Sequence, residues 1–214
     1  DLRRVTVAVA AAVLRAARPL RRIKSLLAYW RDRGIRAAFQ HAVYRLSESG
    51  YERHFGIQSS SVVPLSEVGI TNGNFSECRA TDYLTIRTTL NHLHVRPGAD
   101  VLIDFGAGAG RVLVMAATWP LKKVIGVEFI PEFAETAREN VRRANRRFRC
   151  KDVEVVTTDS RTFAIPPDAT IFYVYNAFAG DILETVLGNI RTSVTDHPRP
   201  HTIVYIRPPG QGEG

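Results

Sequence analysis

The second half of the chain alternates short apolar runs with longer segments in which apolar residues recur at helical spacing. Unbroken apolar runs are typical of strands that are buried on both faces, and the spacing between them indicates amphipathic helices. The pattern predicts strands at residues 101–103, 123–127, 153–157, 170–175 and 202–206 and helices at 81–93, 109–118, 131–145 and 181–193. This order predicts an α/β fold with a doubly wound parallel sheet that is covered by helices on both faces.

The first part of the chain has a different pattern, in which arginine interrupts the apolar residues at short intervals. The apolar run at 5–14 is too short to cross a bilayer, which takes about 20 residues. Residues 20–46 have the spacing of a basic amphipathic helix, and residues 47–76 are rich in Ser, Gly, Pro and Asn, which predicts a loop. We therefore predict a basic helical arm and linker at 1–61 and the main domain at 62–214.

The positive charge lies in this arm. Residues 1–60 carry twelve Lys and Arg against four Asp and Glu, whereas the rest of the chain carries seventeen of each kind and is neutral. Such an arm suits an anionic membrane surface or nucleic acid, and it equally suits a helix that packs on its own domain with its arginines in water. Cys78 and Cys150 lack metal-ligand spacing and indicate free thiols in a reducing compartment. We expect a cytoplasmic protein, with peripheral membrane attachment as the alternative.

A glycine-rich turn, Asp104-Phe-Gly-Ala-Gly-Ala-Gly-Arg111, follows the first strand of the main domain. Gly106, Gly108 and Gly110 allow a sharp turn and a close approach of a ligand to the main chain. The Lys and Ser/Thr of a P-loop are absent, and Arg111 stands where a dinucleotide-binding motif has its last glycine. An acid beside the turn favours a ligand with an amino or positively charged group over a pyrophosphate, because two negative groups would repel.

Four motifs in order resemble those of the class I S-adenosylmethionine-dependent methyltransferases, over roughly residues 62–207. They are Asp104 to Arg111, Val124 to Phe129, Asp159, and Tyr175-Asn-Ala-Phe178. The sequence is most similar to a bacterial group of these proteins, and its last motif is loosely similar to the Asn-containing loop of Dot1-type lysine methyltransferases. The resemblance implies a Rossmann-like methyltransferase fold, S-adenosyl-L-methionine as the cofactor, and methyl transfer to a nitrogen of a protein or small molecule.

Each motif has an expected place in the cofactor pocket. Glu128 follows the turn at about the 20-residue distance at which an acid accepts hydrogen bonds from ribose hydroxyls. By resemblance, Phe129 would stack on adenine, and Asp159 and Ser160 would contact its amino group. Thr81 and Tyr83 match a Thr-x-Tyr element of these proteins, although the Glu-Pro that accompanies it there is absent. The residues expected to contact the cofactor are Asp104, Gly106, Ala107, Gly108, Gly110, Glu128, Phe129, Asp159, Ser160, Thr81 and Tyr83.

Asn176 is the predicted catalytic residue. In related amine methyltransferases the Asn oxygen and a main-chain carbonyl accept hydrogen bonds from the target nitrogen, which aligns its lone pair with the methyl group. Ala177 stands where those enzymes have Pro, so a loop-capping role for Asn176 is the alternative, as a turn role is for Asp159 and a solvated acid for Glu128. No metal is expected, because no His or Cys cluster has ligand spacing.

Two further points complete the sequence-based prediction. After Ile206 too few residues follow for the antiparallel strand pair that usually ends this fold, so the terminal strands are expected to be missing. The alternative function is a non-catalytic module that binds nucleic acid or a membrane through the 1–60 arm and retains the methyltransferase fold. The sequence does not specify the methyl acceptor.

Overall fold

The computed structural model describes residues 45–59, 80–176 and 180–206. The chain divides into two compact units, Asp1–Gly50 and Tyr51–Gly214. In the first unit residues 45–50 are helical, and in the second unit the helical conformation extends to residue 55. The predicted helix before residue 45, most of the predicted loop, and residues 177–179 lie outside the described residues.

The loop prediction is wrong for residues 47–55, which form a helix. The Ser-Glu-Ser-Gly sequence has a local preference for a turn. The free energy gained when the aromatic side chains that follow are buried is larger than the cost of placing these residues in a helix. In the second unit, Phe55 is buried in the core, and the Tyr51 ring stacks on Tyr83 with centroids 4.9 Å apart. Burial of two aromatic side chains outweighs weak local preferences against a helix.

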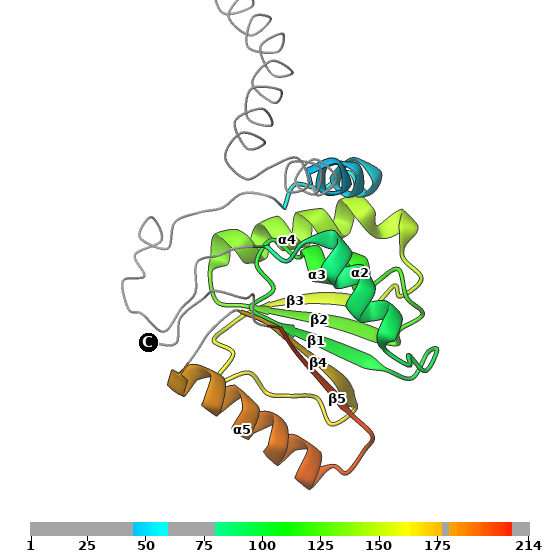
Figure 1. Cartoon of the computed structure of the whole chain (residues 1–214). Helices are drawn as coiled ribbons and strands as arrows, with labels where there is room; N and C mark the ends of the chain where they lie inside the picture. The colour runs from blue at the N-terminus through cyan, green and yellow to red at the C-terminus, as the bar shows by residue number, and fades with distance from the viewer. Residues whose placement is uncertain (1–44, 60–79, 177–179, 207–214) are drawn as a thin grey trace, which may run out of the picture. The chain divides into compact units, whose positions relative to one another are not determined.

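A five-stranded parallel sheet forms the centre of the second unit, in the order β3-β2-β1-β4-β5 (Figure 1). Its strands are β1 (Val101–Phe105), β2 (Lys123–Glu128), β3 (Val153–Thr157), β4 (Ala169–Tyr175) and β5 (Thr202–Ile206). The chain reverses its direction of travel across the sheet between β1 and β4, as it does in Rossmann-like domains. The predicted doubly wound parallel sheet is therefore confirmed. No antiparallel strand joins this sheet within the described ranges.

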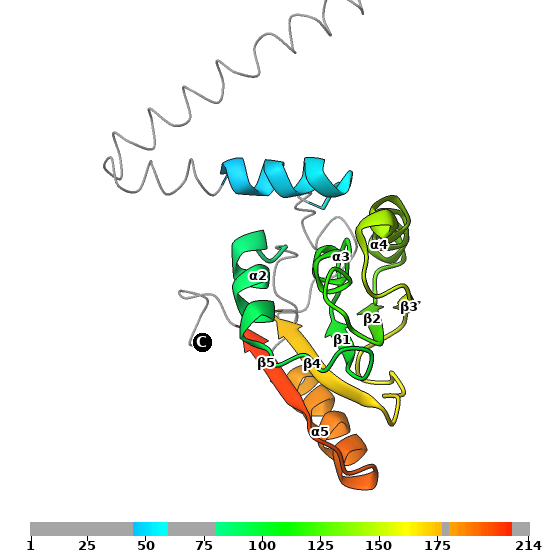
Figure 2. The ribbon, with the colours of Figure 1, turned by 90° about the vertical axis from the view of Figure 1, so that its right-hand side faces the viewer.

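Helices cover both faces of the sheet. On one face lie α2 (Tyr83–His92), α3 (Arg111–Ala116) and α4 (Pro131–Ala144), which continues into η2 (Asn145–Arg147), and on the other face lies α5 (Gly180–Asp196) (Figure 2). Each face has its own apolar cluster: Leu102 of β1 packs with α2 and α3, whereas Ile103 packs with α5. The alternation of strand side chains thus supplies both cores from one apolar run. Every predicted element that the structure describes in full in this domain is present, with ends shifted by three residues at most.

The connection from β3 to β4 is a loop without a helix. Phe163 and Ile165 of this loop pack on the α5 side of the sheet, where the Phe163 ring meets Phe105 edge-on at 6.2 Å. Within the described part of the chain, no helix combines the length and apolarity needed to cross a membrane.

Candidate cofactor site

The turn after β1 follows a path that only glycine adopts easily. The φ angles are +78° at Gly106, +54° at Gly108 and +77° at Gly110, all in the left-handed region. The N–H groups of Gly106 and Ala107 both donate to the carbonyl of Val127, at 2.9 and 3.0 Å. These bonds fix the turn against the end of β2. The predicted turn residues therefore stand together at the carboxyl ends of the two central strands.

The glycines of this region have different surroundings. A Cβ atom on Gly110 would lie 2.9 Å from the Cβ of Ala137, and one on Gly126 would lie 2.5 Å from a methyl group of Leu113. Both glycines make room for helices that pack against the sheet and its turn. A Cβ atom on Gly108 would meet nothing within 4 Å. Gly108 therefore borders open space, unlike Gly110.

Two buried polar atoms beside the turn have no hydrogen-bond partner among the described residues: Oδ2 of Asp104 and the hydroxyl of Tyr173. The two residues are neighbours in register on β1 and β4, and their exposed fractions are 2% and 0%. Burial, and secondly the nearby Asp104, raise the pKa of Tyr173, and the Thr81 side chain opposes this only in small part without making a hydrogen bond to the Tyr173 hydroxyl. Because an unpaired buried polar group costs about 1–3 kcal/mol, such a pair indicates a binding site for a polar ligand.

Asp104 also has an unusual charge state. Burial, and secondly the nearby carboxylate of Glu128, raise the pKa of Asp104 to about 8. A ligand that brings a positive charge would relieve both effects. The sequence predicted Asp104 but missed Tyr173. The available signal was weak, since Tyr173 is one of three hydroxyl-bearing residues in the strand Ala-Thr-Ile-Phe-Tyr-Val-Tyr.

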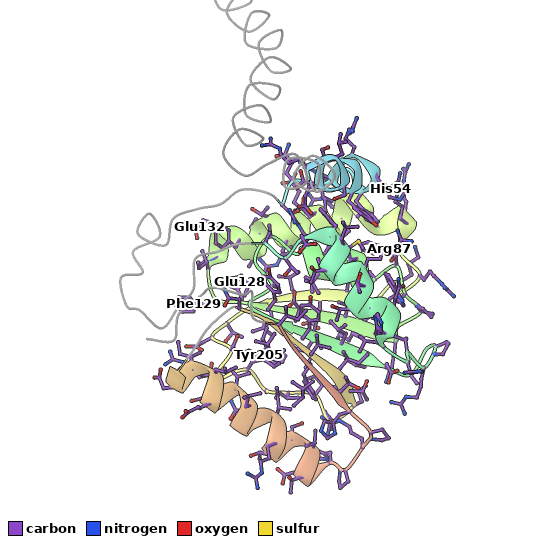
Figure 3. The ribbon with its side chains drawn as sticks, viewed as in Figure 1. His54, Arg87, Glu128, Phe129, Glu132 and Tyr205 are labelled. Atoms are coloured by element: carbon purple, nitrogen blue, oxygen red, sulfur yellow. The ribbon has the colours of Figure 1, made fainter. Side chains whose placement is uncertain are left out.

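Glu128 ends β2 and is buried against the glycine turn. Its Oε2 accepts from the N–H of Gly108 at 2.7 Å, and its Oε1 accepts from the N–H of Ile130 at 2.8 Å. Burial raises the pKa of Glu128, and these backbone donors oppose the effect. Each carboxylate oxygen can accept a second hydrogen bond, so the pair retains capacity for hydroxyl donors. The adjoining Phe129 is half exposed, beside the start of α4 (Figure 3).

Asp159 lies in the loop after β3 and is bound by its neighbour Arg161. The guanidinium donates to both carboxylate oxygens at 2.5 to 3.1 Å, and the N–H of Arg161 donates to Oδ1 at 2.8 Å. This hydrogen bonding lowers the pKa of Asp159. The turn role that we weighed for Asp159 is thus present in the structure. Its contact with adenine, and that of the buried Ser160, stay predictions.

Thr81 and Tyr83 surround a buried arginine. Arg111, the first residue of α3, donates from Nη1 to the Thr81 carbonyl at 2.8 Å and from Nε to the Ser59 hydroxyl at 2.9 Å. Its guanidinium carbon lies 4.3 Å from the centroid of the Tyr83 ring, whose hydroxyl is hydrogen-bonded to Ser59 at 3.0 Å. A buried guanidinium needs such a set of partners. From the sequence, Arg111 served only to argue against a dinucleotide-binding motif, and its buried network was not predicted. The contact of Thr81 and Tyr83 with the cofactor stays a prediction.

Asn176 follows β4 directly. Among the described residues it is the only one besides glycine with a positive φ, +42°, and its N–H donates to the carbonyl of Ile206 at 3.0 Å. A left-handed Asn stores modest strain, and such strain is often found at functional positions. Because the carboxyl ends of parallel strands meet at one edge of a sheet, Asp104, Glu128 and Asn176 share the same edge. Among the described residues, no three His, Cys, Asp or Glu side chains are grouped so that they could hold a metal ion.

A parallel sheet of this order, a glycine turn after its first strand and a carboxylate that ends its second are features of a Rossmann-like cofactor-binding domain. Together with the match of this domain to a methyltransferase family model, they make it a class I S-adenosylmethionine-dependent methyltransferase domain. Residues 77–169, which are less than half of the chain, match the family model described as Protein-L-isoaspartate(D-aspartate) O-methyltransferase.

Two curated relatives share segments of this chain. One, an uncharacterized RNA methyltransferase of Chlamydia caviae, is 34% identical over 80 residues, which cover 35% of this chain and 19% of the relative. The other, an uncharacterized RNA methyltransferase of Chlamydia pneumoniae, is 39% identical over 66 residues, which cover 31% and 16%. The match thus spans less than a fifth of either relative's length.

One solved structure with a similar fold is an RNA methyltransferase from Salinibacter ruber in complex with S-adenosyl-L-homocysteine. It is 26% identical with a TM-score of 0.45, over 59% of this chain and 76% of that chain. The fold class of the present domain rests on its strand order rather than on this likeness.

Proposed function

We propose that this chain transfers a methyl group from S-adenosyl-L-methionine to a nitrogen of an RNA acceptor. The observation that carries the proposal is the pair of unpartnered buried atoms on Asp104 and Tyr173 beside the Glu128 carboxylate. The cofactor brings an ammonium group, which suits the orphaned oxygen of Asp104, and ribose hydroxyls, which suit the free acceptor capacity of Glu128. The open space at Gly108 leaves room for a ligand at the turn.

The residues at the edge of the sheet have simple tasks in this reaction. When bound, S-adenosylmethionine would supply a methyl carbon on a sulfonium centre: the acceptor nitrogen would attack this carbon, the C–S bond would break to release S-adenosyl-L-homocysteine, and the proton of the nitrogen would pass to solvent. Asp104, Tyr173 and Glu128 would hold the donor in place by hydrogen bonds. The amide oxygen of Asn176 would accept from an N–H of the acceptor and so orient the nitrogen lone pair. Orientation of this kind can supply effective molarities on the order of 10⁵ M or more.

The acceptor class is supported by the names of the relatives, since both curated segments belong to RNA methyltransferases. The matching family model is described by O-methylation of an aspartyl group in proteins. An accepting amide such as that of Asn176 suits an N–H donor better than a carboxylate, which has no proton to donate at neutral pH. We therefore place RNA first and a protein carboxylate second.

A transfer assay tests the proposal. The full chain is incubated with labelled S-adenosylmethionine and separate RNA, protein and small-molecule fractions of a cell extract, and mass spectrometry locates the added methyl group. We expect label in RNA nitrogen and a reduction of roughly 100-fold for Asn176→Ala, the scale of a positioned hydrogen-bond acceptor. Asn91→Ala, at an exposed position of α2, is the matched control. Label in protein carboxylates would support the second class, and no label in any fraction would favour the non-catalytic module.

Three further points of the sequence prediction are also proposals. We infer that the predicted division into 1–61 and 62–214 separates an arm from a domain by role, while residues 51–59 belong to the compact unit of the domain. We infer too that the arm adds affinity for nucleic acid or an anionic membrane, and that the protein works in the cytoplasm. The last point is supported by Cys150, a free buried thiol, as is usual in a reducing compartment. If the arm contributes to binding, the affinity of the chain for a polyanion should fall as the salt concentration rises.

A further inference from the structure

A dense group of basic side chains marks the end of α4 and the segment that leads to β3. We name it the α4–β3 basic patch, and its members are Arg142, Arg143, Arg146, Arg147, Arg149 and Lys151. All six are exposed, while Ala144, Phe148 and Cys150 between them are buried. The apolar residues fix the backbone on the core, so that the basic residues face outward from a rigid support.

The acidic residues around the patch are already paired. Glu139 accepts from Arg143 and lies 3.9 Å from Arg142, and Asp152 lies 3.8 Å from Lys123. Three patch guanidinium groups form no ion pair or side-chain hydrogen bond with any described residue: Arg146, Arg147 and Arg149. Their charges are available to a partner. The neutral sum of residues 61–214 therefore conceals a local concentration of positive charge.

The composition of the patch favours a phosphate backbone over a membrane. Peripheral membrane segments combine basic residues with exposed apolar ones that insert among the lipids. The exposed large apolar side chains of the described chain lie elsewhere, at Leu46, Leu84, Phe129, Leu187, Ile203 and Tyr205. Five of the six patch residues are arginines, whose planar fork matches the oxygens of phosphate.

We propose that the α4–β3 basic patch binds the phosphate backbone of the acceptor RNA. The choice of RNA among polyanions rests on the proposed function. The patch lies at the opposite end of α4 from the cofactor site, because α4 begins directly after Glu128 and ends before β3 (Figure 1). Its 14 residues span about 21 Å. The patch would therefore contact the RNA about one helix length away from the reacting nucleotide, at phosphates several nucleotides along the strand.

The test compares two charge-matched variants of the full chain. Arg146→Gln/Arg147→Gln removes two patch charges, and Arg87→Gln/Arg191→Gln removes two exposed charges from α2 and α5. Binding to a fluorescent 20-base-pair RNA duplex is measured by anisotropy over a range of salt concentrations. We expect the patch variant to bind at least about fivefold more weakly at 0.1 M salt, and the slope of log K against log salt to fall by about 2 in magnitude. The control should keep the wild-type slope, and the arm contributes equally to both variants.

Equal affinity and slope for the two variants would overturn the proposal. So would a larger loss of binding to phosphatidylserine vesicles than to RNA in the patch variant. Titration of the same proteins with S-adenosylmethionine separates this inference from the proposed function. If the wild type fails to bind the cofactor while RNA binding still depends on the patch, the proposed function fails and the patch assignment stands.

Discussion

Asp104 sets the electrostatics of the site at the scale of single residues. Its pKa of about 8 lies above the ordinary value of 3.8 because the carboxyl is buried and faces Glu128. Between pH 4 and 8 the folded chain therefore retains a proton that the unfolded chain releases. Linkage requires the free energy of unfolding to fall as pH rises through this window.

This sign leads to a test with Asp104→Asn, whose side chain cannot ionise. Relative to the wild type, the variant should gain roughly 3–4 kcal/mol between pH 5 and pH 8, about 1.4 kcal/mol per pH unit, because the unfolded wild type is stabilised by ionisation of Asp104 and the variant has no group to ionise. Denaturant unfolding at the two pH values measures the gain. Asp168→Asn, at a half-exposed ion pair with Lys122, is the control. A gain that is equal in both variants, or absent in Asp104→Asn, would contradict the assigned charge state.

Arg111 illustrates a residue whose importance depends on its neighbours in space. Its guanidinium connects Ser59, the start of α2 and the first turn of α3 within the core. Arg111→Ala would leave these groups unpaired, and we expect a loss of roughly 2–4 kcal/mol in the free energy of unfolding. Arg87→Ala, at an exposed position, should have little effect in the same unfolding experiment. Similar small effects for both variants would show that the buried network is dispensable.

At the scale of elements, two glycines of the turn have different roles: Gly110 allows a helix to pack closely, and Gly108 leaves room for a ligand. Gly110→Ala brings a methyl group to 2.9 Å from Ala137 and strains a left-handed residue, whereas Gly108→Ala adds strain in open space. We expect Gly110→Ala to lower the free energy of unfolding by roughly 1–3 kcal/mol more than Gly108→Ala. Relative to its loss in the free energy of unfolding, Gly108→Ala should weaken cofactor binding more than Gly110→Ala does. Unfolding and calorimetric titration of both variants test this ranking, and the reverse order in either measurement would refute it.

The elements themselves could be predicted because each carries its signal locally. The apolar runs of β1 and β4 and the spacing of α4 indicate strand and helix without knowledge of the fold. The ends of elements depend on finer detail: α3 starts two residues later than predicted, because Gly110 at its N-cap is left-handed. The helix at residues 47–55 was not predicted, because it is stabilised by burial of aromatic side chains in the core rather than by the helix propensity of its own sequence.

The site was predictable to the same extent. Asp104, Glu128 and Asn176 follow the predicted strands directly, and the geometry of parallel sheets places residues at the carboxyl ends of strands on one edge. Tyr173 and Arg111 could not be predicted as residues of the site or of its support, because Tyr is common in strands and Arg is common in helices. Their roles arise from partners that are distant in sequence, or from the lack of a partner.

At the scale of the whole molecule, positive charge is concentrated in two regions, which the net charge of the chain does not distinguish. The arm carries the excess, whereas the domain is neutral in sum and yet holds the α4–β3 basic patch. A basic segment at 1–60 and a basic patch in the domain are charges that suit a long polyanion, such as the RNA acceptor that we propose, better than a small acceptor.

The most direct measurement of the central claim is a calorimetric titration of the full chain with S-adenosylmethionine at pH 7, in two buffers of different ionisation enthalpy. An ammonium group beside Asp104 would favour its ionised form, so binding should release close to one proton. Asp104→Asn should abolish this release and weaken binding, and NAD should not bind. Absence of S-adenosylmethionine binding, or binding that is unchanged in Asp104→Asn, would contradict the account.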